Sequence, residues 1–133
     1  MQIPDDFHPL LNSTAVAMVS TLGPHGEPQV TPIWFMFDGD AVRFSLVDGR
    51  QKLRNIQRDP RVAVLVVNPA LPTYYLELRG TAELVEDQEC ELERAVSVKY
   101  TGSWTDGEAA GTNRYAATVR VERTTSQRGH GAE

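Results

Sequence analysis

The residues with the clearest chemical potential lie in one basic segment, residues 50–61. This segment carries a formal charge of +4, whereas the rest of the 133-residue chain carries −9. A local positive field inside an acidic protein indicates a small anionic ligand rather than nucleic acid. The segment holds one acid, Asp59, and five cations: Arg50, Lys52, Arg54, Arg58 and Arg61.

The same segment is predicted to form a helix of about two turns, because Leu53 and Ile56 lie three residues apart between Gly49 and Pro60. The first turn of a helix presents unpaired N–H groups and the positive end of its dipole, which favour a phosphate. Helical spacing makes Lys52 and Asn55 neighbours and places Arg54 and Arg58 on another face. We therefore predict Arg50, Lys52 and Asn55 as phosphate ligands, and Arg54 or Arg58 as contacts to a more distant acidic group. From these residues alone, a solvated basic helix stays open as the alternative.

Elsewhere the chain offers no side-chain set that could catalyse a reaction by itself. His8, His25 and His130 are far apart and lack the spacing of metal ligands. There is no Ser/His/Asp arrangement, and the single Cys90 excludes an internal disulfide. The sequence therefore predicts no catalytic side chain and no metal site.

The elements around the basic segment are predicted to be mainly strands of one domain, residues 1–123. Short turns between apolar runs predict a six-stranded antiparallel barrel with short helices, and Gly80 is expected to mark a bulge. A tail, residues 124–133, lacks apolar side chains and is predicted to be disordered. No membrane-length apolar run or signal-peptide pattern is present, so we expect a cytoplasmic protein and no membrane partner. Strands are expected at 15–22, 27–37, 41–47, 61–67, 74–85 and 114–121, and helices at 4–11, within 50–59, and at 87–101.

Three stretches of this sequence resemble the pyridoxamine-phosphate-oxidase-like superfamily of flavin-binding split β-barrels. They are Thr31-Pro-Ile-Trp-Phe35, the string from Arg50 to Val62, and Tyr75-Leu-Glu-Leu-Arg-Gly80. The basic string is most similar to the branch that uses the deazaflavin coenzyme F420. The resemblance spans residues 8–121.

This resemblance implies a homodimer with two cofactor sites and a small-molecule substrate. The tail phosphate would be held by residues matching Arg50 and Lys52, with Asn55 beside them and Arg54 reaching the glutamates beyond it. The cofactor ring is expected along the strands near Ser20, Val30, Thr31, Pro32 and Ile33.

The implied function is transfer of a hydride between F420 and a small organic acceptor. An FMN-binding oxidoreductase of the same fold and a non-catalytic F420 carrier are the alternatives. Vitamin B6 oxidation is not expected, because the C-terminal Arg-x-His substrate motif of the oxidases proper is missing. Trp34 could pack in the core or form a wall of the substrate pocket or dimer interface. Trp104 could be a lid within the loop 102–113 or simply pack that loop down.

Overall fold

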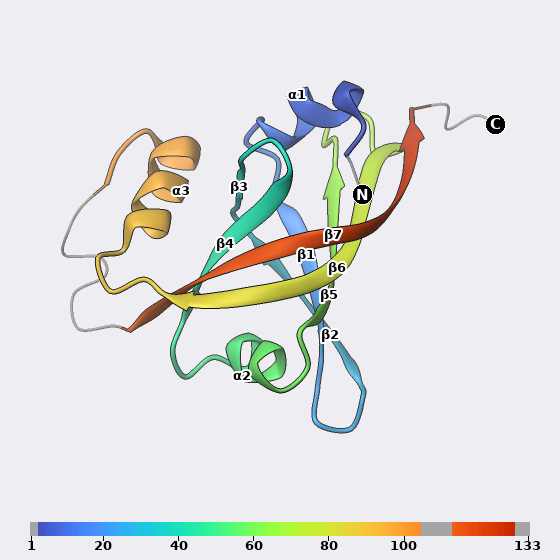
Figure 1. Ribbon diagram of the computed structural model, residues 1–133. Helices are drawn as coiled ribbons and strands as arrows, with labels where there is room; N and C mark the ends of the chain where they lie inside the picture. The colour runs from blue at the N-terminus through green and yellow to red at the C-terminus, as the bar shows by residue number, and fades with distance from the viewer. Residues whose placement is uncertain (1–2, 105–112, 130–133) are drawn as a thin grey trace.

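The computed structural model of the chain describes residues 3–104 and 113–129 (Figure 1). Within them, seven antiparallel strands curl into a half-open barrel, so the prediction of a mainly β split barrel with short helices is confirmed. The strands are β1 (Ala17–Leu22), β2 (Pro28–Ile33), β3 (Met36–Phe37), β4 (Ala41–Val47), β5 (Arg61–Val67), β6 (Tyr74–Glu86) and β7 (Arg114–Arg128). The helices are the 3-10 turn η1 (Asp5–Phe7), α1 (His8–Leu11), α2 (Gln51–Arg58) and α3 (Glu91–Thr101).

The strand order explains how the sheet curls. It runs β2-β1-β5-β6-β7-β4-β3, so the two edge strands, β2 and β3, follow one another in the chain. Only Trp34 and Phe35 separate them, which brings the two edges of the sheet together. Helix α2 lies at one end of this curled sheet and α1 at the other (Figure 1).

The predicted single strand from Glu27 to Phe37 is wrong, and this accounts for seven strands instead of six. The chain leaves the ladder after Ile33 because the backbone of Phe35 binds side chains of α3. Phe35 N–H donates to the Tyr100 hydroxyl at 3.4 Å, and the Phe35 carbonyl accepts from Lys99 Nζ at 2.8 Å. The fully buried Phe35 ring then fills the core at the point where the chain crosses between the edges.

The prediction of disorder after Arg123 is wrong for residues 124–128, while residues 130–133 lie outside the described range. β7 continues to Arg128, and its last residues pair with the start of β6, from Tyr74 to Leu78. Arg128 also forms an ion pair with Asp6 and lies 4.8 Å from the centre of the Phe7 ring. Backbone pairing and these contacts order a stretch that has almost no apolar side chains.

Truncation after Thr124 is therefore expected to destabilise the protein. It removes the ion pair of Arg128 with Asp6, the contact of Arg128 with the Phe7 ring, and the backbone pairing of this strand end with β6. Chemical denaturation should show a lower unfolding free energy than that of the full chain. A midpoint identical to that of the full chain would contradict the contribution of this strand end.

The core lies inside the curl and anchors the helix that carries the basic segment. Leu53 and Ile56 of α2 are buried against the apolar cluster of the sheet, together with Phe44, Leu76 and Leu78. Because these two side chains point inward, the start of α2 is held over the ends of β2 and β4. None of the helices in the described ranges is long and apolar enough to cross a membrane.

Candidate functional site

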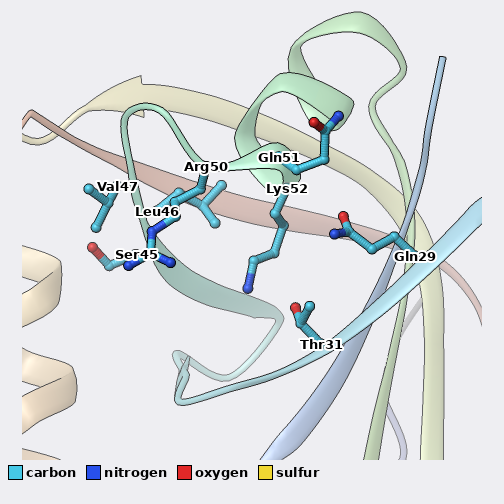
Figure 2. A pocket seen from close by; sticks show the side chains of 8 residues that line it. All are labelled: Gln29, Thr31, Ser45, Leu46, Val47, Arg50, Gln51 and Lys52. Atoms are coloured by element: carbon cyan, nitrogen blue, oxygen red, sulfur yellow. The ribbon is translucent and has the colours of Figure 1, made fainter.

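A pocket of about 480 Å³ lies between the start of α2, the end of β4 and the edge strand β2. Figure 2 shows the Lys52 side chain extending from α2 toward Thr31 of β2, across the open space. The lining residues are Gln29, Thr31, Ser45, Leu46, Val47, Arg50, Gln51 and Lys52. The structure thus brings two cations from the basic segment and one of the predicted ring-binding residues, Thr31, into one cavity.

The turn before α2 leaves the helix end open to this pocket. Gly49 adopts a φ of 91°, a conformation that favours glycine, and it turns the chain from β4 into the helix. Arg50 is the N-cap residue, and no side chain among the residues that the structure describes caps the helix. The positive end of the helix dipole therefore adds to the charges of Arg50 and Lys52.

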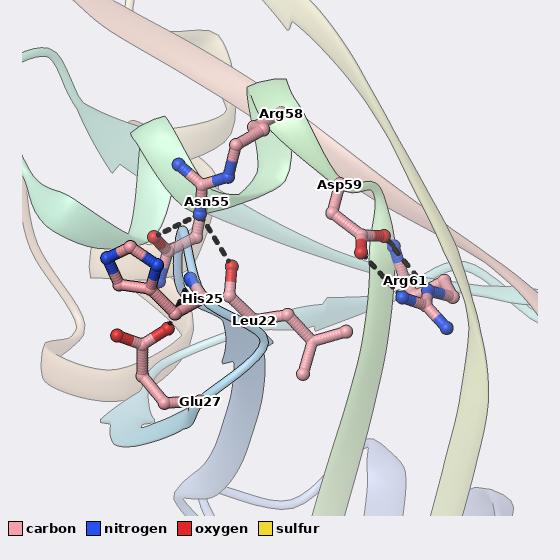
Figure 3. A network of polar contacts seen from close by, with 7 residues as sticks. All are labelled: Leu22, His25, Glu27, Asn55, Arg58, Asp59 and Arg61. Carbon is pink, nitrogen blue, oxygen red and sulfur yellow. Dashed lines mark hydrogen bonds and ion pairs between the residues drawn. The ribbon is translucent and has the colours of Figure 1, made fainter.

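The five cations of the segment divide into two groups according to their partners. Arg54 donates to the Gly49 carbonyl at 2.8 Å and to Gln51 at 2.9 Å. Arg58 donates to the Leu22 carbonyl and to Asn55, and Arg61 pairs with Asp59 at 2.7 Å, as Figure 3 shows. These three arginines bond to partners within the protein, which argues against the predicted role of Arg54 or Arg58 as a contact to a more distant acidic group.

Arg50 and Lys52 form the second group. Among residues 3–104 and 113–129, neither side chain has a hydrogen bond or an ion-pair partner. Burial lowers the pKa of Lys52, and the nearby Arg50 guanidinium lowers this pKa further. Two like charges that face one cavity with no counter-ion would both be stabilised by an anion placed between them.

Thr31 supplies the third feature of the pocket. Its Oγ1 is buried yet has no hydrogen-bond partner in the described part of the chain. A buried hydroxyl without a partner is costly, and a ligand atom within the pocket would supply the missing bond. The side chains present therefore fit a ligand that combines a phosphate with further polar atoms.

Asn55 has a different place from the one predicted. It is buried, and its amide nitrogen donates to Thr21 at 3.0 Å and to Gln29 at 3.1 Å. Its amide oxygen accepts from Gln51 at 2.7 Å and from Arg58 at 3.1 Å. With both donors and both lone pairs used, the amide has no capacity left for a phosphate. Asn55 instead ties α2 to β1 and β2 and orients two glutamines of the pocket.

The predicted ring-binding residues are distributed over both faces of β2, because neighbouring strand residues point in opposite directions. Thr31 faces the pocket and Ile33 is buried in the core. Val30 and Pro32 face outward, and Ser20 pairs with Val30 across the ladder. Their side chains do not line the pocket, so a role in ring binding would rest on the backbone of the edge strand β2, where Pro32 has no N–H to donate.

Neither tryptophan lines the pocket. Trp34 is 44% exposed and stacks on Tyr100 with ring centres 5.0 Å apart, so it does not pack in the core. Trp104 is half-buried, with the Arg94 guanidinium 5.8 Å from its ring centre. The proposed lid falls mainly on residues 105–112, which lie outside the described range.

Sequence reasoning missed Gln29, Ser45 and Gln51 as pocket residues. Gln51 precedes Asn55 by one helical turn and was detectable as an i, i+4 pair of polar side chains. Ser45 sits at a half-buried position of the alternating strand β4, where a polar side chain was a weak signal. Gln29 is distant from both residues in sequence, and only the fold brings it next to them.

Residues 3–128 of the chain match a protein family described as pyridoxamine 5'-phosphate oxidase. A solved structure of an F420 reductase is 34% identical to this chain, with a TM-score of 0.86, covering 94% of this chain and 100% of the other. A conserved hypothetical protein from Mycobacterium tuberculosis is 25% identical, with a TM-score of 0.81 and coverage of 99% and 88%. A Clostridium acetobutylicum protein related to general stress protein 26 is 21% identical, with a TM-score of 0.66 and coverage of 95% and 91%, and shares the fold.

Proposed function

We propose that this chain, which belongs to the pyridoxamine 5'-phosphate oxidase family, is an F420-dependent oxidoreductase. Its reaction would transfer a hydride between the deazaflavin and a small organic acceptor. The observation that carries the proposal is the pair Arg50 and Lys52, which face the pocket without hydrogen-bond or ion-pair partners in the described part of the chain. The similarity to an F420 reductase over 94% of the chain supports F420 as the cofactor.

The protein's own contribution would be binding and orientation. Arg50 and Lys52 would hold the tail phosphate, and the Thr31 hydroxyl would bond a polar atom of the cofactor. The unpaired backbone groups of the edge strand β2 would fix the edge of the ring. When bound, the cofactor supplies the redox chemistry, so no catalytic acid–base pair is required of the chain.

Turnover separates this function from a carrier role. Reduced F420 mixed with the protein and an electron-poor alkene or quinone should be oxidised at a rate proportional to protein concentration. Tight binding with no oxidation by any acceptor would instead support a carrier. Turnover with reduced FMN but not with reduced F420 would favour the FMN-dependent alternative, since both cofactors present a phosphate to the same two cations.

Cofactor affinity should depend on pH through Lys52. Its ammonium group attracts the phosphate only when protonated, and burial sets its pKa below the ordinary value of 10.5. The affinity should therefore fall as the pH rises through this lowered pKa, over a range that begins below the one in which an ordinary lysine titrates. Lys52→Arg stays protonated over this range, so its dissociation constant should stay level. Parallel pH profiles for the two proteins would remove Lys52 from the site.

We also propose that a second copy of the chain covers the outer face of the β1–β2 hairpin. Met18 and Val30 are 39% and 63% exposed, and the ladder places them on the same face as Pro32. Trp34 extends this apolar face beyond the strand. Replacing Met18 and Val30 together by lysine should convert a dimer into a monomer in sedimentation velocity. A monomeric unmodified protein, or a variant that stays dimeric, would contradict this interface.

A further inference from the structure

Arg114 lies on β7, the strand that pairs with the β4 wall of the pocket. In the antiparallel ladder Val47 pairs directly with Arg114, and Ser45 lies diagonally across. Ser45 and Val47 both line the pocket, and alternation places Arg114 on the same face of the sheet. Arg114 does not line the cavity itself, but it lies beside two residues that do, and it belongs to β7 rather than to the basic segment.

The contacts of Arg114 are specific. Its Nη1 donates to Ser45 Oγ at 3.3 Å and forms an ion pair with Glu93 at 2.8 Å. The side chains of Arg114 and Glu93 are only 13% and 21% exposed, so solvent screens this pair weakly. The bond from Arg114 is the one hydrogen bond of the Ser45 hydroxyl that residues 3–104 and 113–129 provide.

The direction of this bond determines what the serine can do. A guanidinium can only donate, whereas a serine hydroxyl has one proton and two lone pairs. Ser45 must therefore accept from Arg114, and its own proton is left to donate to something else. Without Arg114, no other hydrogen bond from residues 3–104 and 113–129 fixes which way this hydroxyl points.

We propose that Arg114 is a positioning residue of the pocket, which holds the Ser45 hydroxyl as a hydrogen-bond donor to the ligand's phosphate. This inference rests on the proposed function, since it requires a phosphate bound beside Arg50 and Lys52. Ser45 then contacts the ligand, and Arg114 acts through Ser45. Glu93 accepts from the same guanidinium at 2.8 Å, and a neutral side-chain amide could accept that bond as well.

A double-mutant cycle on cofactor binding tests this role. Dissociation constants for F420 and for FMN are measured by fluorescence for the unmodified protein, Ser45→Ala, Arg114→Met and the double variant. Each single change should weaken binding about tenfold, the effect of losing one hydrogen bond to a charged group. The double variant should also lose only about tenfold, because both changes remove the same bond.

Two controls separate positioning from folding. Glu93→Gln breaks the same ion pair but keeps the donor to Ser45, so it should bind no more weakly than the unmodified protein. Ser45→Thr keeps a hydroxyl and should retain the affinity. If Arg114→Met does not fold, Arg114→Lys replaces it. An ammonium also only donates, so this variant should retain the affinity, and Ser45→Ala should still weaken binding about tenfold in it.

A loss near one hundredfold in the double variant would show independent roles and overturn the inference while leaving the cofactor assignment intact. Equal weakening by Glu93→Gln and Arg114→Met would also overturn it, because the ion pair alone would then explain the effect. If the unmodified protein binds neither cofactor, the proposed function fails, and this inference fails with it.

Discussion

Replacing Arg50 and Lys52 together by alanine is expected to weaken F420 binding by about 2–4 kcal/mol. Each side chain is expected to make a charge-assisted hydrogen bond to the phosphate, at about 1.5–3 kcal/mol for an isolated bond. Both residues line the pocket and have no acceptor within the described chain, so their loss breaks no internal bond. Folding should therefore be unaffected, and calorimetric or fluorescence titration should report the loss directly.

The matched control is the double replacement of Arg54 and Arg61 by alanine. It removes the same two positive charges from the same segment, but these side chains bond to Gly49, Gln51 and Asp59. We expect it to change cofactor affinity far less than the Arg50 and Lys52 pair does. An equal loss in both double variants would mean that only the overall field matters and that neither set contacts the phosphate.

Gly80→Ala is expected to lower the unfolding free energy by about 3–5 kcal/mol, at the upper end for single substitutions. The register between β6 and β7 shifts at Arg79 and Gly80, which confirms the predicted bulge. A Cβ at Gly80 would lie 1.9 Å from the Arg120 carbonyl oxygen, so the two longest strands would have to separate. Since domains of this kind are stable by about 5–15 kcal/mol, the loss should be evident in urea denaturation.

Glu83→Ala provides the comparison for Gly80→Ala on the same pair of strands. Glu83 pairs with Arg120 at 3.2 Å, and both side chains are more than half exposed. Its loss should cost far less than the clash at Gly80, because solvent screens an exposed ion pair. If Gly80→Ala were no more destabilising than Glu83→Ala, the close approach of the backbones at the bulge would be contradicted.

Most of the fold followed from local patterns in the sequence. The strand expected at 74–85 is β6, and the spacing of Leu53 and Ile56 predicted α2. The helix expected at 87–101 begins at Glu91, and the Asp87 carboxylate accepts from the N–H groups of Glu91 and Leu92.

The failures share a physical cause, because each depended on a partner distant in sequence. Residues 124–128 have little tendency to order alone, yet β6 supplies the backbone pairing. The strand break at Phe35 depends on Lys99 and Tyr100, which lie 64 and 65 residues further along the chain. Local propensity carries no information about such contacts.

The candidate site was likewise predicted only where the signal was local in sequence. Charge and helical position identified Arg50 and Lys52, and the structure places both in one pocket with Thr31. The same helical geometry suggested Asn55, but its polar partners Thr21 and Gln29 lie 34 and 26 residues away, on β1 and β2. A helical wheel shows which residues are neighbours on a helix, but not which side another strand will cover.

The most direct test is a titration of the purified protein with F420 and, separately, with FMN, each at two salt concentrations. Fluorescence of the cofactor or of the tryptophans would report binding. The proposed function predicts tight binding of F420 that weakens with salt, because two cations hold its phosphate, and weaker binding of FMN. Preference for FMN would assign the protein to the flavin-dependent alternative. Binding of neither cofactor would contradict the assignment of Arg50 and Lys52 as a phosphate site.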